Sequence, residues 1–137
     1  MLNTEPNDKP TFIISLSKIL RSFGYAFKGI AYATSTQLNF RVHLVAMLIA
    51  ILMGYALHIN VNEWVWIILC ITLVLVMELL NTAIETLTDL VSPGYHEKAG
   101  HVKDIAAGAV VITALFALIT GVIIFLPKLL NLMYNAA

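Results

Sequence analysis

The chain has 137 residues, of which 60% are apolar and 12% are charged, and its formal net charge is zero. A soluble domain averages about 45–50% apolar and about 25% charged residues, and so short a chain needs a polar exterior to stay in water. The composition therefore excludes a soluble globular enzyme and predicts a single-domain integral membrane protein. The balanced charge argues against a nucleic-acid-binding protein, and the one cysteine, Cys70, excludes a disulfide framework.

The first part of the chain divides into a polar tail and an amphipathic segment. Residues 1–10 lack the basic segment and apolar core of a secretory signal, and we expect a disordered cytoplasmic tail ahead of one membrane domain, residues 11–137. Residues 11–33 carry apolar side chains at helical spacing on one face. A second face carries Lys18, Arg21, Tyr25 and Lys28. This pattern predicts a helix in the membrane interface, with its basic face toward anionic lipid headgroups or toward a soluble anion.

Three later segments are apolar enough to cross a bilayer as helices of about 20 residues. They are residues 42–62, residues 64–90 and residues 105–127. All but one of the eight basic residues precede the first segment or lie between the second and third, and the exception is Lys128. Because basic loops stay in the cytoplasm, we expect the N-terminus inside and the C-terminus outside. The predicted fold is an all-α integral membrane protein with one interfacial helix and three transmembrane helices.

Small residues recur at four-residue intervals in the third segment, at Ala109, Thr113, Ala117 and Gly121. Such a stripe lets two helix backbones approach closely in lipid. It favours a symmetric homo-oligomer, because three helices have little internal surface to bury against one another. Packing within one chain would use the same stripe, and the sequence does not separate the two.

A polar stripe follows the second segment at helical spacing, formed by Glu78, Asn81, Glu85 and Asp89. Glu78 and Glu85 would lie about 10 Å apart along a helix axis. A carboxylate near the end of a spanning segment costs a few kcal/mol unless it is paired or hydrated. The stripe therefore predicts a site that holds a metal or moves a proton. The alternative is that Glu85 and Asp89 are simply solvated where the helix leaves the bilayer.

Breaker and basic residues come next and complete the candidate site. Ser92, Pro93 and Gly94 should end the helix in a turn. Lys103 and Asp104 stand at the start of the third segment, where free backbone N–H groups also favour anions. With the basic interfacial face they could receive a polyphosphate, without the glycine-rich P-loop of many nucleotide-binding proteins.

Two sequence stretches make the chain recognisable: ELLNTAIETLTD at residues 78–89 and KDIAAGAV at residues 103–110. They closely resemble the bacterial diacylglycerol kinase and undecaprenol kinase family, and the similarity runs from about residue 15 to residue 129. The resemblance implies a homotrimer with sites shared between neighbouring chains. It also implies phosphorylation, dependent on ATP and Mg²⁺, of the hydroxyl of a membrane lipid alcohol at the cytoplasmic face of a bacterial inner membrane.

The resemblance assigns roles to particular positions. Glu78 matches the general base for the lipid hydroxyl, Asn81 the polar residue beside it, and Glu85 a ligand of Mg²⁺. The positions that match nucleotide contacts are Lys18, Tyr25, Gly94, Tyr95, His96, Lys103 and Asp104. Gln37 stands where the family usually carries a second metal-binding Glu. Because Mg²⁺ prefers anionic oxygen ligands, we expect activity to survive with a raised magnesium requirement.

Two other functions remain open from the sequence. One is a non-enzymatic membrane protein with a cation or proton pathway lined by Glu78, Asn81 and Glu85. The other is a catalytically degenerate member of the family that lost activity with the change at Gln37. The apolar segments do not distinguish undecaprenol from diacylglycerol, although the NFRVH stretch and the IIFLPK ending look more like the undecaprenol kinase branch.

Overall fold

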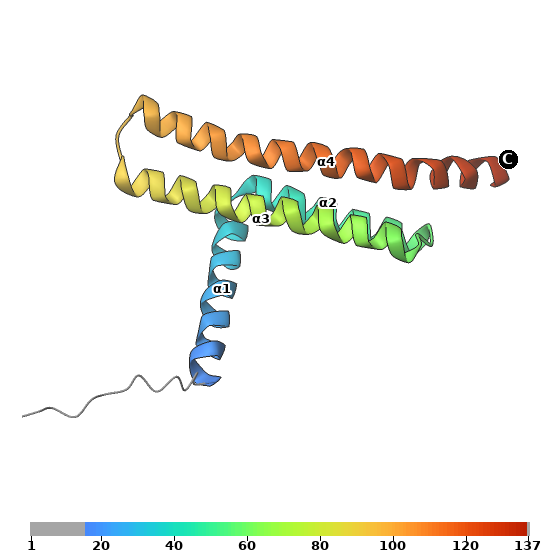
Figure 1. Cartoon of the computed structure of the whole chain (residues 1–137), viewed down its shortest axis with the longest axis horizontal. Coiled ribbons are helices and arrows are strands. Elements are labelled where there is room, and N and C mark those ends of the chain that lie inside the picture. The colour runs from blue at the N-terminus through green and yellow to red at the C-terminus, as the bar shows by residue number, and fades with distance from the viewer. Residues whose placement is uncertain (1–15, 137) are drawn as a thin grey trace, which may run out of the picture.

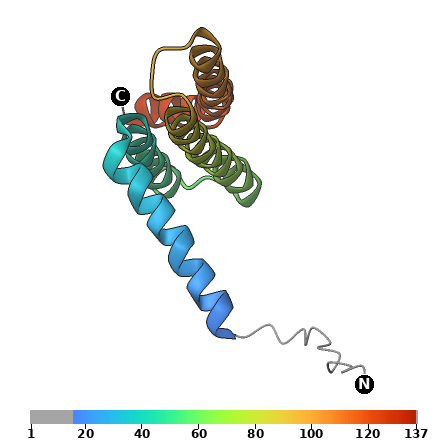
Figure 2. The same cartoon turned by 90° about the vertical axis from the view of Figure 1, so that its left-hand side faces the viewer.

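The computed structural model describes residues 16–136, which form four α-helices joined by short links and contain no strand. The helices are α1 (Leu16–Thr36), α2 (Leu38–Ala56), α3 (Val61–Val91) and α4 (Glu97–Ala136). Helices α2, α3 and α4 lie side by side, and α1 leaves their bundle at a steep angle (Figures 1 and 2). Three helices are long and apolar enough to cross a membrane. The predicted all-α fold is confirmed.

The link between α2 and α3 corrects one predicted boundary. Residues 42–62 were expected to form one segment, but α2 already ends at Ala56. His58 then adopts a left-handed backbone with φ of 48°. The Asn60 side chain accepts a hydrogen bond from the Glu63 N–H at 3.0 Å, and the Glu63 carboxylate accepts one from the Asn60 N–H at 2.7 Å. This reciprocal capping box starts α3, so residues 61 and 62 belong to the next helix.

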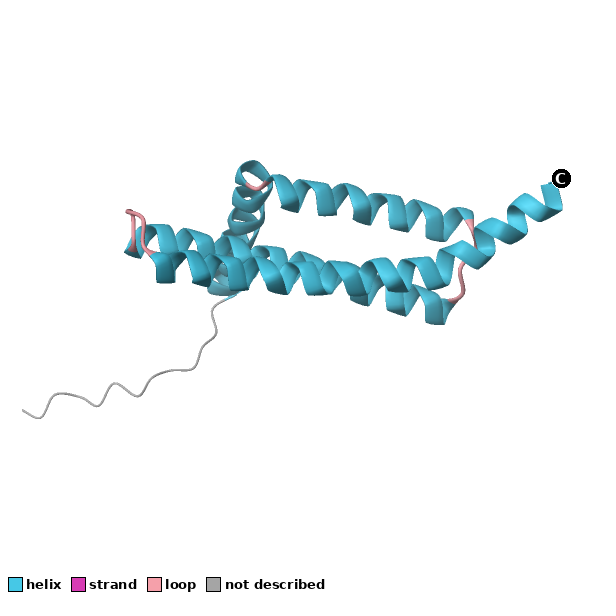
Figure 3. Ribbon diagram, turned by 90° about the horizontal axis from the view of Figure 1, so that it is seen from above, coloured by secondary structure: helices cyan, strands magenta, loops and turns pink. Residues whose placement is uncertain are grey.

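Helix α4 is longer at both ends than the predicted segment 105–127. It begins at Glu97, so Lys103 and Asp104 lie in its second turn, beyond the free backbone N–H groups that the sequence pattern had placed beside them. It also continues through Pro127, and its C-terminal end extends beyond the link between α2 and α3 (Figure 3). Forty helical residues measure about 60 Å, roughly twice the hydrocarbon thickness of a bilayer. Both ends of α4 therefore project from a membrane that its middle crosses.

Helix α1 touches the bundle only near its C-terminal end. Ala33 is buried there, whereas Phe23 and Phe27 remain exposed. The structure therefore gives the amphipathic helix that the pattern predicts, beginning at Leu16 and ending at Thr36. The expected tail, residues 1–10, and the first residues of the predicted helix, 11–15, lie outside the described residues.

The bundle has a small core and an apolar exterior. Ile59, Ile67, Ile124 and Phe125 form a buried cluster at the end where α2 turns into α3. At that end the ammonium of Lys128 lies 3.1 Å from the Glu63 carboxylate and joins α4 to α3. Large apolar side chains elsewhere face outward along the three long helices, for example Leu48, Ile68 and Leu118. An exterior of this kind suits hydrocarbon rather than water.

Gly54 tests the packing of the α2–α3 turn. A Cβ at this position would lie 2.7 Å from the Trp64 ring, with Ile59 behind it at 3.1 Å. Such overpacking typically costs about 1–3 kcal/mol. We expect Gly54→Ala to lower the unfolding temperature in detergent, measured by circular dichroism. Gly108→Ala is the control, because no atom lies within 4 Å of its added Cβ, and an equal loss in both variants would contradict the prediction.

Candidate functional site

The polar stripe of α3 is buried at its first two residues, Glu78 and Asn81, together with the neighbouring Thr82. Glu78, Asn81 and Thr82 are 2%, 8% and 5% exposed, respectively. Glu78 lies about 26 Å along α3 from the first residue of that helix, which is close to the ~30 Å hydrocarbon thickness. The stripe therefore begins where α3 would leave the hydrocarbon region. Burial of a carboxylate at this depth requires partners or a function.

Glu78 faces α2 rather than open solvent. The imidazole Nε2 of His43, on α2, lies 3.3 Å from Glu78 Oε1. Oε1 itself has no hydrogen-bond partner among the described residues. The Thr82 hydroxyl donates to the backbone carbonyl of Glu78 at 2.9 Å and so adds no contact to the carboxylate. Glu78 therefore keeps an acceptor atom that is buried, close to one imidazole and open to a further donor.

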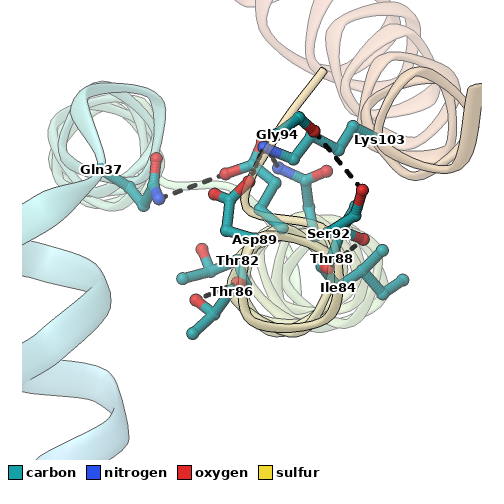
Figure 4. A network of polar contacts seen from close by, with 11 residues as sticks. Gln37, Thr82, Ile84, Thr86, Thr88, Asp89, Ser92, Gly94 and Lys103 are labelled. Carbon is teal, nitrogen blue, oxygen red and sulfur yellow. Dashed lines mark hydrogen bonds and ion pairs between the residues drawn. The ribbon is translucent and has the colours of Figure 1, made fainter. Parts of the chain in front are cut away.

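Glu85, two turns further along α3, receives two amide donors. Gln37 Nε2 donates to one carboxylate oxygen at 3.2 Å, and Asn81 Nδ2 donates to the other at 3.0 Å. Gln37 caps the start of α2, and Figure 4 shows its side chain reaching across toward α3. The structure thus brings Gln37, Asn81 and Glu85 together. It presents Gln37 as a hydrogen-bond donor to that carboxylate.

The last carboxylate of the stripe, Asp89, forms an exposed ion pair. The ammonium of Lys103, on α4, contacts the carboxylate of Asp89 at the end of α3 (Figure 4). Both side chains are substantially exposed, at 36% and 66%. Exposed pairs contribute little stability, so Lys103 can exchange Asp89 for another anion at small cost.

The remaining predicted nucleotide contacts are spread around this end of the bundle. Gly94, Tyr95 and His96 lie exposed in the link between α3 and α4, and Asp104 is exposed on the first turns of α4. Tyr25 and Lys18 lie on α1, about 18 Å and about 28 Å along the helix from Gln37. Because α1 points away from the bundle (Figure 2), a single chain does not gather these two side chains around Glu85.

The donor set around Glu85 suits a magnesium–phosphate complex better than a closed metal cage. Among the described residues, no three His, Cys, Asp or Glu side chains group together as a metal site. However, Asn81 Oδ1 is buried without a hydrogen-bond partner, next to the Glu85 carboxylate. Mg²⁺ typically takes one or two protein oxygens and completes its shell with water and substrate phosphates. The residues therefore fit such an ion when phosphates accompany it.

An apolar groove of about 480 Å³ runs between α2, α3 and α4, and it approaches Glu78 through His43, since the carboxylate itself is not part of the lining. His43 lines its polar end, and Leu129 and Met53 line the other. Along α4 the lining extends from Ala114 to Leu129, a length of about 22 Å. Two members of the small-residue stripe, Ala117 and Gly121, line this groove. Their small side chains leave space there instead of drawing α4 against α2.

Sequence reasoning missed the proximity of His43 to Glu78. It lies within an uncharged apolar segment, and the polar stripe is read from α3 alone. A periodic pattern shows which residues share one helix face, but it does not show which residue of another helix meets that face. The ion pair between Asp89 and Lys103 was missed for the same reason.

Comparison with known proteins places the chain among lipid kinases of bacteria. The family model described as prokaryotic diacylglycerol kinase matches residues 24–125. The chain is 44% identical over 116 residues to a diacylglycerol kinase of Synechocystis, covering 84% of this chain and 66% of that protein. It is 40% identical to the undecaprenol kinase of Bacillus subtilis, covering 83% and 93%. It is 34% identical to the diacylglycerol kinase of Escherichia coli K12, covering 79% and 88%.

Gln37→Glu tests the donor set around Glu85. The change places a second carboxylate beside Glu85 and removes the amide donor. Repulsion should lower the unfolding temperature without divalent cation, and Mg²⁺ should restore it because the two anions then share an ion. The variant should also reach half-maximal activity at a lower Mg²⁺ concentration than the native chain.

Gln37→Met is the matched control, because it loses the donor without adding charge. Its unfolding temperature should respond to Mg²⁺ as the native chain does. If Gln37→Glu keeps the native magnesium dependence in both measurements, the expected role of this position is wrong.

Proposed function

Because the chain belongs to the prokaryotic diacylglycerol kinase family, we propose that it transfers a phosphoryl group from Mg²⁺–ATP to the hydroxyl of a membrane lipid alcohol. One observation carries the proposal: an apolar groove between the helices ends at His43, whose imidazole lies 3.3 Å from the buried carboxylate of Glu78. A lipid chain fits an apolar groove, and its hydroxyl would reach the Glu78 carboxylate beside His43.

The groove supports the lipid part of the proposal. Its lining is apolar apart from His43 and the thiol of Cys70, among the residues that the structure describes. A length of about 22 Å covers much of one hydrocarbon span. A chain lying in it would bring its hydroxyl to the Glu78 end, where α3 leaves the hydrocarbon region.

In the proposed reaction Glu78 acts as the general base. Its carboxylate takes the proton from the lipid hydroxyl while the hydroxyl oxygen forms a bond to the γ-phosphorus of ATP. The bond from that phosphorus to the bridging oxygen breaks, and ADP leaves with the electron pair. Phosphoryl transfer needs little covalent help, so positioning and charge stabilisation supply most of the catalysis.

The nucleotide is proposed to bind at the adjoining surface of the bundle. Glu85 and Asn81 would hold Mg²⁺, with Gln37 beside them, and the ion when bound would neutralise phosphate charge. Lys103 would leave its ion pair with Asp89 for the phosphates. Asp104 and the 94–96 turn would contact the remainder of the nucleotide.

A homotrimer with shared sites accounts for the position of α1. Lys18 and Tyr25 are exposed on a helix that points away from its own bundle. A neighbouring chain could bring these side chains to a nucleotide, which the same chain does not. We place the protein in a bacterial cytoplasmic membrane with the N-terminus inside, as the distribution of basic residues favours.

A cation or proton pathway fits the structure less well. Beyond Glu78, toward the opposite end of α3, the buried residues are Val74, Cys70 and Ile67. No polar path crosses the bundle through the described residues of that helix face. The polar stripe therefore serves one surface of a membrane and does not connect two.

The identity of the lipid substrate is a separate question, because the names of the relatives differ on it. Those of Synechocystis and Escherichia coli are named diacylglycerol kinase, and that of Bacillus subtilis is named undecaprenol kinase. Both lipids carry a primary hydroxyl at headgroup depth. We propose undecaprenol first, on the NFRVH and IIFLPK stretches, with diacylglycerol as the second candidate.

Transfer of labelled phosphate from Mg²⁺–ATP to each lipid in mixed micelles tests the function. The native protein should label at least one lipid, and the ratio of the two rates identifies the preferred substrate. Glu78→Gln and Glu85→Gln should lower kcat by at least about a hundredfold, because they remove the base and the charge at the metal site.

Glu63→Gln is the matched control. It removes a carboxylate at the opposite end of α3, and glutamine can still complete the capping box. Its kcat should stay close to that of the native chain. Absence of labelled product from both lipids, even at high Mg²⁺, would leave the degenerate relative as the better reading.

Ala117→Leu tests whether the lipid chain lies in the groove. The larger side chain would fill space beside α2 and α3, so KM for the lipid should rise severalfold while KM for ATP stays constant. Ala107→Leu, on an exposed part of α4 outside the groove lining, should change neither. An unchanged lipid KM in Ala117→Leu would place the chain elsewhere.

A further inference from the structure

We propose that His43 is a positioning residue for the reaction, which holds the Glu78 carboxylate against the lipid hydroxyl through its Nε2–H. The inference rests on the proposed kinase function. It assigns a role to a residue of α2, the helix that faces the polar stripe from across the bundle.

The first support is the geometry of the pair. His43 Nε2 lies 3.3 Å from Glu78 Oε1, yet that oxygen has no hydrogen-bond partner among the described residues. The distance is slightly longer than that of an ordinary N–H···O hydrogen bond, and the two groups are not aligned well enough to form one. The terminal torsion of a histidine has a broad energy minimum. A modest ring rotation would therefore complete the bond.

The second support is the lack of any other donor to that oxygen. Glu78 is 2% exposed, and the amide groups of Gln37 and Asn81 both donate to Glu85 instead. A buried carboxylate without a donor would be strongly disfavoured. His43 is therefore the one described side chain placed to fix the direction in which Glu78 presents its second oxygen.

The third support is where His43 stands relative to the groove. It lines the groove, contacts Glu78 and is itself 25% exposed. A hydroxyl arriving along the groove would meet the imidazole and the carboxylate together. A general base acts only when it is within hydrogen-bond reach of its proton, so a residue that fixes its orientation affects the rate more than it affects binding.

Three substitutions at His43 separate positioning from packing. The amide nitrogen of glutamine reaches roughly the position of imidazole Nε2, whereas that of asparagine reaches roughly the position of Nδ1. We expect His43→Leu and His43→Asn to lower kcat by about tenfold to a hundredfold, a range typical of a misplaced catalytic group. His43→Gln should recover most of the rate, and KM for ATP should stay within about twofold in all three. His58→Asn, at the left-handed turn where asparagine is well tolerated, controls for loss of an imidazole elsewhere.

A measurement independent of activity follows the contact itself. Protein carrying ¹⁵N-histidine and ¹³C-glutamate, reconstituted in lipid bilayers, should show a dipolar coupling between an imidazole nitrogen and a glutamate δ-carbon. The coupling should disappear in His43→Leu, which assigns it. Unfolding temperatures of the three variants in detergent then show whether each remains folded.

The outcomes are distinct. A native kcat in His43→Leu, equal rates in the glutamine and asparagine variants, a rise in lipid KM alone, or no coupling in the native protein would each overturn the proposal. If the native protein shows the coupling but phosphorylates neither lipid, the kinase function fails and the catalytic role of His43 fails with it. The contact between His43 and Glu78 would then stand as a structural one.

Discussion

The burial of the Glu78 carboxylate is the constraint on which the site depends. Burying a charge at the edge of the hydrocarbon region costs free energy unless hydrogen bonds or an opposite charge compensate it. Two features reduce this cost for Glu78: the imidazole of His43 on α2 lies close to the carboxylate, and Glu78 stands near the end of the apolar part of α3. Helices α2 and α3 must therefore lie in the register that brings His43 opposite Glu78.

The same register places the second carboxylate. Two turns beyond Glu78, Glu85 accepts a hydrogen bond from the side-chain amide of Gln37, which lies at the junction of α1 and α2. This bond links the end of α1 to the polar stripe of α3. Further on, Asp89 meets Lys103 from α4. One face of α3 thus contacts the neighbouring helices through three carboxylates. Along the chain, the buried carboxylate of Glu78 comes first and the exposed carboxylate of Asp89 comes last. This gradient from buried to exposed suits a reaction between a lipid and a water-soluble phosphate donor.

The small residues of α4 show how one pattern serves more than one purpose. Ala117 and Gly121 belong to a stripe that favours close approach of helices, and within one chain they line an apolar groove. In hydrocarbon, a groove of this kind is stable because lipid chains can occupy it, whereas in water it would tend to collapse.

Residue patterns along the chain were enough to predict the membrane class, the three spanning helices, the amphipathic first helix and the stripe of Glu78, Asn81 and Glu85. These follow from periodicity and charge along one helix at a time, and the motif at residues 78–89 added the family. The start of α3 at Val61 escaped prediction because the capping box of Asn60 and Glu63 lies inside a polar link that looked like the end of the preceding segment. The packing of the helices was needed to show that His43 lies next to Glu78, that Gln37 donates to Glu85, and that two small residues of α4 line a groove. Each depends on the rotation of one helix against another, and helical spacing within a single segment carries no information about that rotation.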